Sequence, residues 1–215
     1  MDDQPPLPRL AAVTLEAMLA ESPLVLVTGA RGVGATTLAA QLRPWHLSIS
    51  LDDYTTLAEA RDHPEELVRR APRMLIEELQ REPTLLQALG AAIREDAEPG
   101  RYLVTACAEL DGIFGDRIGR LRLWPLTRGE RLGLGVAGLW GDLLDTPAAE
   151  WYDLVLEVGG EREEWWELAR RGSLPELVLN GEGGAERRLR EQVRRCLEQD
   201  LRDLSATSRL LRCTG

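Results

Sequence analysis

The feature that most constrains the fold is a glycine-rich segment, GARGVGAT, at residues 29–36. An apolar run at 24–28 precedes it, and residues 36–42 have the pattern of a helix. The segment matches the phosphate-binding pattern G-x-x-x-x-G-K-[ST] except at the lysine, where Ala35 stands. A glycine-rich turn between a strand and a helix of another α/β fold would give the same letters. The motif alone therefore leaves both interpretations open.

The phosphate-binding interpretation assigns a role to each part of this loop. Its glycines would let backbone N–H groups turn toward phosphates, and the positive end of the following helix would add to the attraction. Thr36 would place a hydroxyl on Mg²⁺, and Thr37 would donate near the α-phosphate. The predicted nucleotide-binding residues are Gly29, Ala30, Arg31, Gly32, Val33, Gly34, Ala35, Thr36 and Thr37.

The alanine at position 35 predicts weak nucleotide binding and weaker catalysis. A lysine there normally bridges the β- and γ-phosphates and neutralises charge as the γ-phosphoryl group leaves. This chain contains no lysine at any position. Loss of one hydrogen bond to a charged group, about 1.5–3 kcal/mol, predicts an affinity about ten- to hundredfold lower. Arg31 is not expected to replace the lysine, because its planar guanidinium starts from the wrong side of the loop.

Strands alternate with helices along the chain, which predicts a parallel sheet in an α/β domain. The predicted strands lie at 24–28, 46–51, 73–76, 102–106 and 121–124. The predicted helices lie at 7–21, 36–42, 55–70 with an interruption at Pro64, 83–94 and 185–204. The apolar stripe predicted to be buried consists of Leu10, Val13, Ala17 and Met18 in the first helix. In the last helix it consists of Leu189, Val193, Leu197 and Leu201.

The third predicted strand ends in two carboxylates, Glu77 and Glu78, in the form of a Walker B strand. In such a strand the first acidic residue holds magnesium, usually through water, and the second polarises the attacking water. Glu77 is thus the predicted magnesium residue, although it is one methylene longer than the usual aspartate. Glu78 is the candidate catalytic base. A solvated acidic start of a helix would look the same.

Together these segments resemble the prokaryotic AAA-type ATPases that carry a C-terminal DUF4143 domain. The resemblance extends over roughly residues 20–210 and depends on the order and spacing of short motifs. The matching segments are GARGVGATTL at 29–38, HLSISLDD at 46–53, LIEELQR at 75–81, LVTAC at 103–107, GDR at 115–117, PLTRGE at 125–130, RGSLPE at 171–176 and LEQDLRDL at 197–204.

The resemblance implies an AAA-like P-loop NTPase fold that binds ATP and Mg²⁺, with a parallel sheet flanked by helices and a small C-terminal helical region. Arg117 matches an arginine that would sense the γ-phosphate, and a solvated surface arginine is the alternative. Three positions depart from the family, namely Ala35, Glu77 and the Thr-Ala-Cys at 105–107. The expected organisation is an N-terminal helix at 1–22, a core at 23–130, a lid-like region at 131–183 and, at 184–215, a helix that begins a truncated DUF4143-like segment.

Three functions remain open on these grounds. The first is a nucleotide-binding pseudo-ATPase with little or no hydrolysis. The second is an active ATPase with unusual Walker residues, in which Glu78 is the base. The third is a protein-interaction module or truncated remnant that keeps the fold without a nucleotide. Measured binding separates the third from the others, and phosphate release separates the first two.

The composition of the chain limits the binding partners and the cellular location that we expect for it. The formal net charge of −10 opposes binding to nucleic acid. The chain has three cysteines and two histidines without metal-ligand spacing, so no metal centre of these residues is expected. It shows neither a signal peptide nor an apolar stretch long enough to span a membrane, so a cytoplasmic location is expected. Trp151, Trp165 and Trp166 mark a region that either forms a local core or binds a partner, including a second copy.

Overall fold

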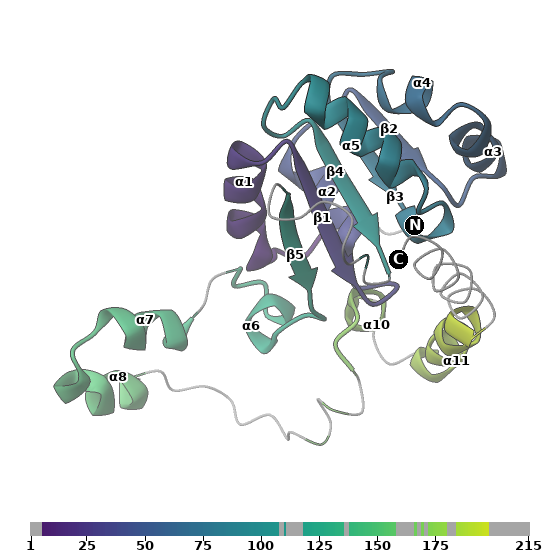
Figure 1. Ribbon diagram of the computed structural model, residues 1–215. Helices are drawn as coiled ribbons and strands as arrows, with labels where there is room; N and C mark the ends of the chain where they lie inside the picture. Colours follow the sequence, from purple (N-terminus) through teal and green to yellow (C-terminus); the bar gives the residue numbers. More distant parts are fainter. Residues whose placement is uncertain are drawn as a thin grey trace.

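Five parallel strands form the central sheet of the protein (Figure 1). The computed structural model describes residues 6–107, 110, 118–135, 138–157, 166, 169, 172–179 and 184–197. The strands are β1 (Leu24–Gly29), β2 (Leu47–Ser50), β3 (Met74–Glu77), β4 (Tyr102–Ala106) and β5 (Gly119–Leu123). Their order in the sheet is β2-β3-β4-β1-β5. The predicted fold class, a parallel sheet of the P-loop type flanked by helices, is confirmed.

Helices cover both faces of this sheet. One core contains alternate residues of β1, such as Leu24 and Leu26, packed against helices α3, α4 and α5. The other core contains Val25 and Val27, packed against α1 and α2. Burial on both faces explains why the strands are continuous apolar runs. The helices are α1 (Ala11–Glu21), α2 (Ala35–Leu42), α3 (Tyr54–Asp62), α4 (Pro64–Val68) and α5 (Leu85–Glu95).

The predicted buried stripe of the first helix is correct at Met18, which is partly buried against the core, and wrong at Val13 and Ala17. The structure buries Leu15 and Leu19 of α1, whereas Val13 is 77% exposed. Ala17 is exposed as well, and Leu10 lies at the N-terminal cap. The segment AAVTLEAMLAE has apolar residues around its whole circumference, so several stripes fit its sequence equally well.

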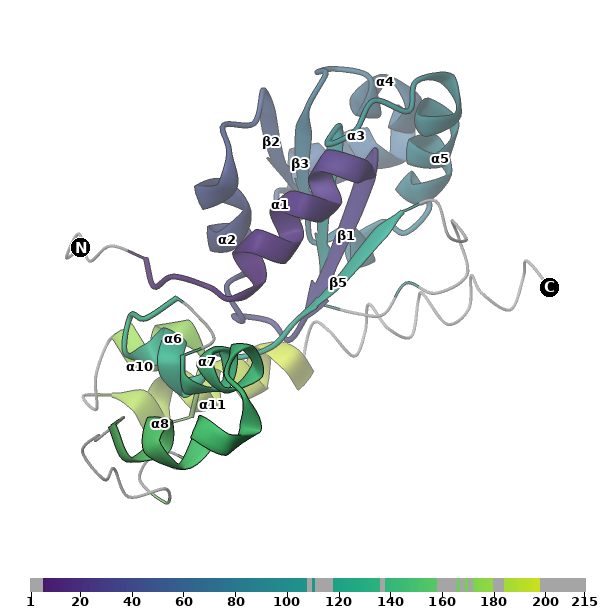
Figure 2. The ribbon, with the colours of Figure 1, turned by 90° about the vertical axis from the view of Figure 1, so that its left-hand side faces the viewer.

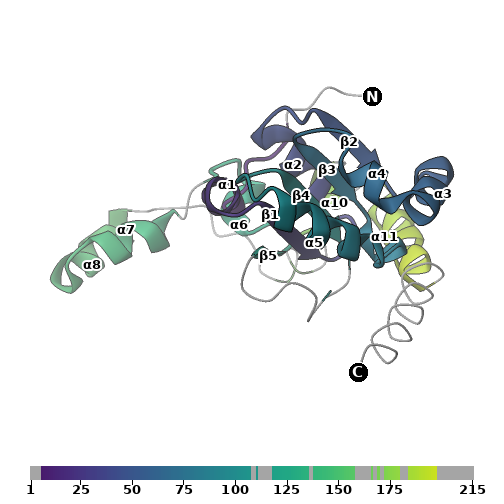
Figure 3. The same ribbon diagram turned by 45° about the horizontal axis from the view of Figure 1, so that its top comes forward.

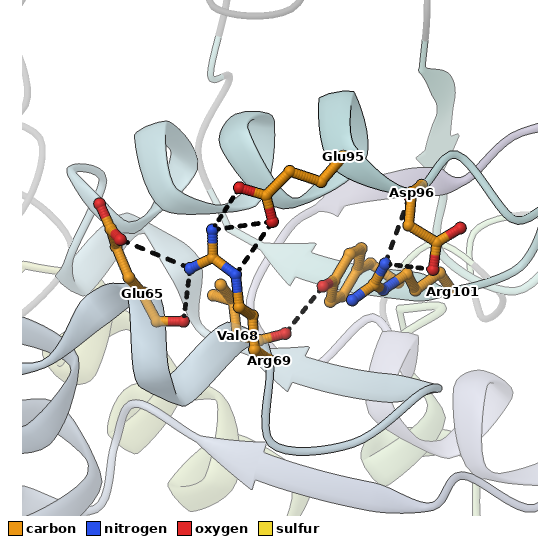
Figure 4. Close-up of polar contacts among 7 residues, drawn as sticks. Glu65, Val68, Arg69, Glu95, Asp96 and Arg101 are labelled. Carbon is orange, nitrogen blue, oxygen red and sulfur yellow. Dashed lines mark hydrogen bonds and ion pairs between the residues drawn. The ribbon is translucent and has the colours of Figure 1, made fainter.

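Tyr102 connects the sheet to the helical layer over one face. Its side chain is fully buried, and its hydroxyl donates a 2.7 Å hydrogen bond to the carbonyl of Val68 at the end of α4. Beside it, Arg69 pairs with Glu95 at the end of α5, which joins α4 to α5 at the surface, and with Glu65 within α4 (Figure 4). Exposed pairs of this kind contribute little to stability, so the buried hydroxyl is the stronger link.

The substitution Tyr102→Phe is expected to lower the free energy of unfolding by about 1–2 kcal/mol, because it leaves the buried carbonyl of Val68 without its donor. Urea denaturation followed by circular dichroism measures the change. Tyr54→Phe is the control, since Tyr54 is 83% exposed and should shift the value by less than about 0.5 kcal/mol. Equal effects of the two substitutions would contradict the assigned role.

The helices that follow β5 lie beyond the carboxyl ends of the strands (Figure 2). They are α6 (Arg128–Arg131), α7 (Leu139–Asp145), α8 (Trp151–Glu157), α10 (Pro175–Leu179) and α11 (Ala185–Arg195). Helices α7 and α8 stand away from the sheet, whereas α10 and α11 lie close to the end of β1 (Figures 1 and 3). No helix in the described part of the chain has the length and apolar character needed to cross a membrane.

The predicted burial of the last helix is also wrong. Leu189, Val193 and Leu197 are 45%, 49% and 59% exposed. Leu201, the fourth member of that stripe, lies outside the described residues. The four-residue spacing correctly indicates one apolar face, but the sequence does not say what covers that face.

Candidate functional site

A tight loop joins the end of β1 to the start of α2. Gly34 is the N-cap of α2, and its φ of 92° is a backbone conformation that non-glycine residues rarely adopt. Gly29 has no room for a side chain, because a Cβ atom there would lie 2.6 Å from the carbonyl oxygen of Leu123. Two of the glycines in the motif are thus required by the backbone itself. The loop leads into the N-terminal turn of an eight-residue helix, an arrangement that favours anions.

A pocket of about 370 Å³ opens over this loop. Its volume falls within the range common for small-ligand sites. All nine residues predicted from the motif line it, together with the predicted base Glu78. The lining residues are Gly29, Ala30, Arg31, Gly32, Val33, Gly34, Ala35, Thr36, Thr37, Glu78, Thr105, Ala106, Cys107, Pro175, Glu176 and Leu179.

The charge of this lining is unusual for a site that would hold phosphates. Arg31 is its basic residue, whereas Glu78 and Glu176 are acidic. Ala35 contributes a methyl group where the motif has a cation. Attraction for a polyanion therefore depends on the backbone N–H groups of the loop, on the helix N-terminus and on any bound Mg²⁺.

Glu77 lies at the end of β3, next to the first turn of α2. Burial raises the pKa of its carboxyl group, the hydrogen bond with the Thr36 side chain opposes that rise, and the neighbouring charges of Glu78 and Asp52 add to it. The structure thus brings together the two predicted magnesium residues, Thr36 and Glu77. A hydroxyl and a carboxylate are oxygen ligands of the kind that Mg²⁺ prefers, so the residues present fit this ion.

Glu78 is held in a strained backbone conformation by a polar network. Its φ of 61° is the one positive value at a non-glycine residue in the described ranges, and such strain costs about 1–3 kcal/mol. The Gln80 amide donates a 2.6 Å hydrogen bond to the Glu78 carboxylate and accepts one from the backbone N–H of Cys107. The buried side chain of Gln80 therefore fixes Glu78 relative to the end of β4. The sequence motifs do not predict this role of Gln80.

Arg31 is bound to carboxylates across the pocket. Its guanidinium lies 2.9 Å from a carboxylate oxygen of Glu78 and 3.7 Å from one of Asp52, with its side chain only 11% exposed. The guanidinium thus lies beside the predicted base, and Glu78 is paired with a cation in this structure. That Arg31 does not take the place of the missing lysine stays a prediction.

Helices from the C-terminal region complete the pocket wall. Pro175, Glu176 and Leu179 of α10 face the loop. The side-chain amide of Gln192 in α11 donates a hydrogen bond to the carbonyl of Arg31. Gln192 and Arg31 are 161 positions apart, and no local pattern in the sequence indicates these contacts.

A buried ion pair between Arg9 and Glu130 also contacts the phosphate loop. Arg9 bonds to Glu130 at 3.0 Å and also donates to the carbonyls of Val33 and Trp124. The Glu130 carboxylate accepts further hydrogen bonds from the backbone N–H groups of Leu10 and Thr127. Arg9 therefore ties the N-terminal segment, the phosphate loop and the end of β5 together. Sequence reasoning missed this pair, because its members are 121 residues apart.

Two further expectations concern a γ-phosphate sensor and a metal centre. Arg117, the predicted γ-phosphate sensor, lies outside the described residues, so its role stays a prediction. The described residues contain no group of three or more histidine, cysteine, aspartate or glutamate side chains arranged to hold a metal ion.

Comparisons with known proteins give distant structural similarities and one family. A Walker-type ATPase of Pyrococcus abyssi aligns with a TM-score of 0.46 and 14% identity, over 96% of this chain and 79% of that chain. The replication initiator DnaA bound to AMPPCP and single-stranded DNA aligns with a TM-score of 0.40 and 15% identity, over 85% of this chain and 63% of that chain. A protein of the signal transduction ATPases with numerous domains, from Pyrococcus horikoshii, aligns with a TM-score of 0.38 and 15% identity, over 70% of this chain and 28% of that chain.

The comparison with curated proteins gives no match. A family model described as an AAA domain matches residues 21–132, just over half of the 215 residues. The matched segment begins before β1 and ends after α6, so it includes the whole sheet and the phosphate loop. The chain belongs to the AAA domain family of P-loop proteins.

Proposed function

We propose that this chain binds ATP with Mg²⁺ over the loop at 29–37 and hydrolyses it slowly or not at all. The observation that carries the proposal is the pocket itself, which all nine predicted nucleotide-binding residues line while position 35 offers no cation. The backbone geometry for holding phosphates is retained, and the charge that would stabilise the transition state is absent. Such a protein would signal by occupancy of the site and not by turnover.

The paired state of Glu78 also supports slow turnover. A base that orients the attacking water needs an accepting carboxylate free to reach it. Glu78 instead binds Arg31 at 2.9 Å and Gln80 at 2.6 Å. Mg²⁺, when bound, would screen the phosphate charge, and Thr36 and Glu77 are the residues to hold it. We also propose that the chain is related to the DUF4143-containing ATPases, on the motifs quoted above. Its proposed parts are the N-terminal helix at 1–22, the core at 23–130, the lid-like region at 131–183 and the C-terminal segment at 184–215.

The test is single-turnover phosphate release with protein in excess over ATP and Mg²⁺ present. The wild type should release phosphate no faster than Glu78→Gln, because Glu78 does no chemistry in a pseudo-ATPase. An active ATPase with unusual Walker residues would instead release phosphate at about 1 s⁻¹ or faster and lose that rate in Glu78→Gln. That second outcome would overturn the proposed lack of turnover.

Thr36→Val tests the proposed magnesium site separately. This variant keeps the side-chain shape and removes the hydroxyl, so the affinity for ATP in the presence of Mg²⁺ should fall about five- to tenfold. Without Mg²⁺ its affinity should equal that of the wild type. Thr37→Val is the matched control, since a donor to the α-phosphate should matter equally with and without the ion. A loss in Thr36→Val that is independent of Mg²⁺ would remove Thr36 from the metal site.

A further inference from the structure

A helical hairpin at residues 138–157 leaves its apolar side chains in water. It comprises α7, the short turn Ala148–Glu150 and α8, and no described side chain within it is buried. The exposed apolar residues are Trp140, Leu144, Trp151, Tyr152, Val155 and Leu156, of which Leu144 is 84% exposed. Helices of seven residues are too short to be stable alone in water. Such a hairpin needs a surface on which to bury its apolar residues.

The charge of this hairpin points to a basic partner. It carries Asp142, Asp145, Glu150, Asp153 and Glu157 and has no arginine, lysine or histidine. Acidic and apolar side chains are therefore interleaved along both helices. A complementary surface would combine exposed apolar residues with arginines.

Helix α11 has that combination. Leu189 and Val193 of α11, and Leu197 two residues after its end, repeat at four-residue spacing and are between 45% and 59% exposed, so they form one apolar stripe. Arg187, Arg190 and Arg194 flank the stripe on the same helix, and all three are exposed. Helix α11 also contacts the phosphate loop, through the side chain of Gln192. The apolar stripe of α11 is thus an unpartnered surface of the described structure.

The two surfaces lie on different sides of the protein. The hairpin projects from one side of the sheet, and α11 lies on the other (Figures 1 and 3). Helix α7 contacts α8, and α11 contacts α10. The hairpin of one molecule therefore meets α11 most readily on a neighbouring molecule.

We propose that the chain self-associates head to tail, with the acidic hairpin 138–157 of one copy docked on the basic apolar face of α11 in the next. The contact is heterologous, because each copy uses two different surfaces. Both surfaces are small, so the interface is at the weak end of specific contacts, with a dissociation constant on the order of micromolar. Opposite charges line the two faces, so added salt weakens the contact. This inference does not depend on nucleotide binding.

Sedimentation velocity of the full chain over a concentration series tests the proposal. The wild type should form dimers and larger species at tens of micromolar protein, on the scale expected for a weak interface. Raising the salt from about 50 to 200 mM should weaken association severalfold. Leu144→Glu in the hairpin and Val193→Glu in α11 should each raise the apparent dissociation constant at least tenfold. Val13→Glu, at a 77% exposed position of α1, is the control and should associate as the wild type does.

Mixing the two defective variants separates a head-to-tail contact from the other arrangements. Leu144→Glu retains an intact α11, and Val193→Glu retains an intact hairpin, so an equimolar mixture should form a heterodimer that does not grow further. Pairing of two hairpins would leave Val193→Glu able to dimerise alone, which would overturn the proposal. A wild type that is monomeric at every concentration would overturn it too, since the hairpin would then fold back on its own chain. Circular dichroism confirms that each variant is folded.

Discussion

Replacing Ala35 by lysine is expected to tighten the binding of ATP with Mg²⁺ about ten- to hundredfold. Ala35 lies in the first turn of α2 and lines the pocket, so the new side chain starts from the pocket wall. It would add an ammonium group to a lining in which Arg31 is already paired with Glu78. A hydrogen bond to a charged group contributes about 1.5–3 kcal/mol, which corresponds to that gain in affinity.

Ala35→Met is the matched control for this prediction. Methionine has nearly the length of lysine and no charge, so it reports any effect of bulk alone. Titration with a fluorescent ATP analogue should show a gain for lysine and no gain, or a loss, for methionine. Equal affinities of the two variants would mean that no phosphate lies near position 35. The gain should also be larger for ATP than for AMP, because the lysine acts on the β- and γ-phosphates.

Breaking the buried pair of Arg9 and Glu130 is expected to give the largest loss of stability among single substitutions at the polar positions that the structure describes. Glu130→Leu leaves the guanidinium of Arg9, 6% exposed, without its carboxylate, which costs about 3–5 kcal/mol of unfolding free energy. The double variant Arg9→Met with Glu130→Leu should recover much of this, because no charge is then left unpaired. Glu186→Ala is the control, since it breaks an exposed helix pair with Arg190 worth about 0.3–0.5 kcal/mol.

The same pair predicts a pH dependence. Burial acts to raise the pKa of Glu130, but hydrogen bonds from the backbone of Thr127 and Leu10 and the charge of Arg9 outweigh it, so the pKa is lowered in the folded protein. A lowered carboxyl pKa stabilises the fold fully above the unfolded value of about 4.3 and ceases to do so as the pH falls through the folded value. Urea titrations from pH 7 to 3 should therefore show the wild type and Glu130→Leu converging toward the acid end. A constant difference across that range would contradict the assigned ionisation.

Local patterns predicted the sheet well and the long-range contacts poorly. Strand β4 was predicted with its observed bounds, and β1, β2 and β3 within two residues, because apolar runs between turn residues are decided locally. The loop residues were predicted because their spacing is itself the phosphate-binding geometry. The faces of α1 and α11 were not, since helical periodicity marks an apolar stripe without identifying its partner.

The contacts that distant segments of the chain make in the site could not be predicted from sequence patterns. Gln80 and Gln192 are neutral amides with no spacing rule, yet one fixes Glu78 and the other contacts the backbone of Arg31. The pairing of Arg9 with Glu130 depends on the fold bringing the N-terminal segment to the end of β5. Thr127 and Glu130 form a capping box at the start of α6, and Arg9 pairs with the same Glu130 carboxylate.

Nucleotide binding is tested by titrating the wild-type chain with a fluorescent ATP analogue and Mg²⁺, with unlabelled ATP as competitor. We expect saturable, competitive binding with a dissociation constant in the micromolar range. We expect no phosphate release from the bound nucleotide beyond that of Glu78→Gln. Absence of binding up to millimolar nucleotide would show that the loop at 29–37 does not hold ATP and would leave an AAA domain that acts only through its surfaces.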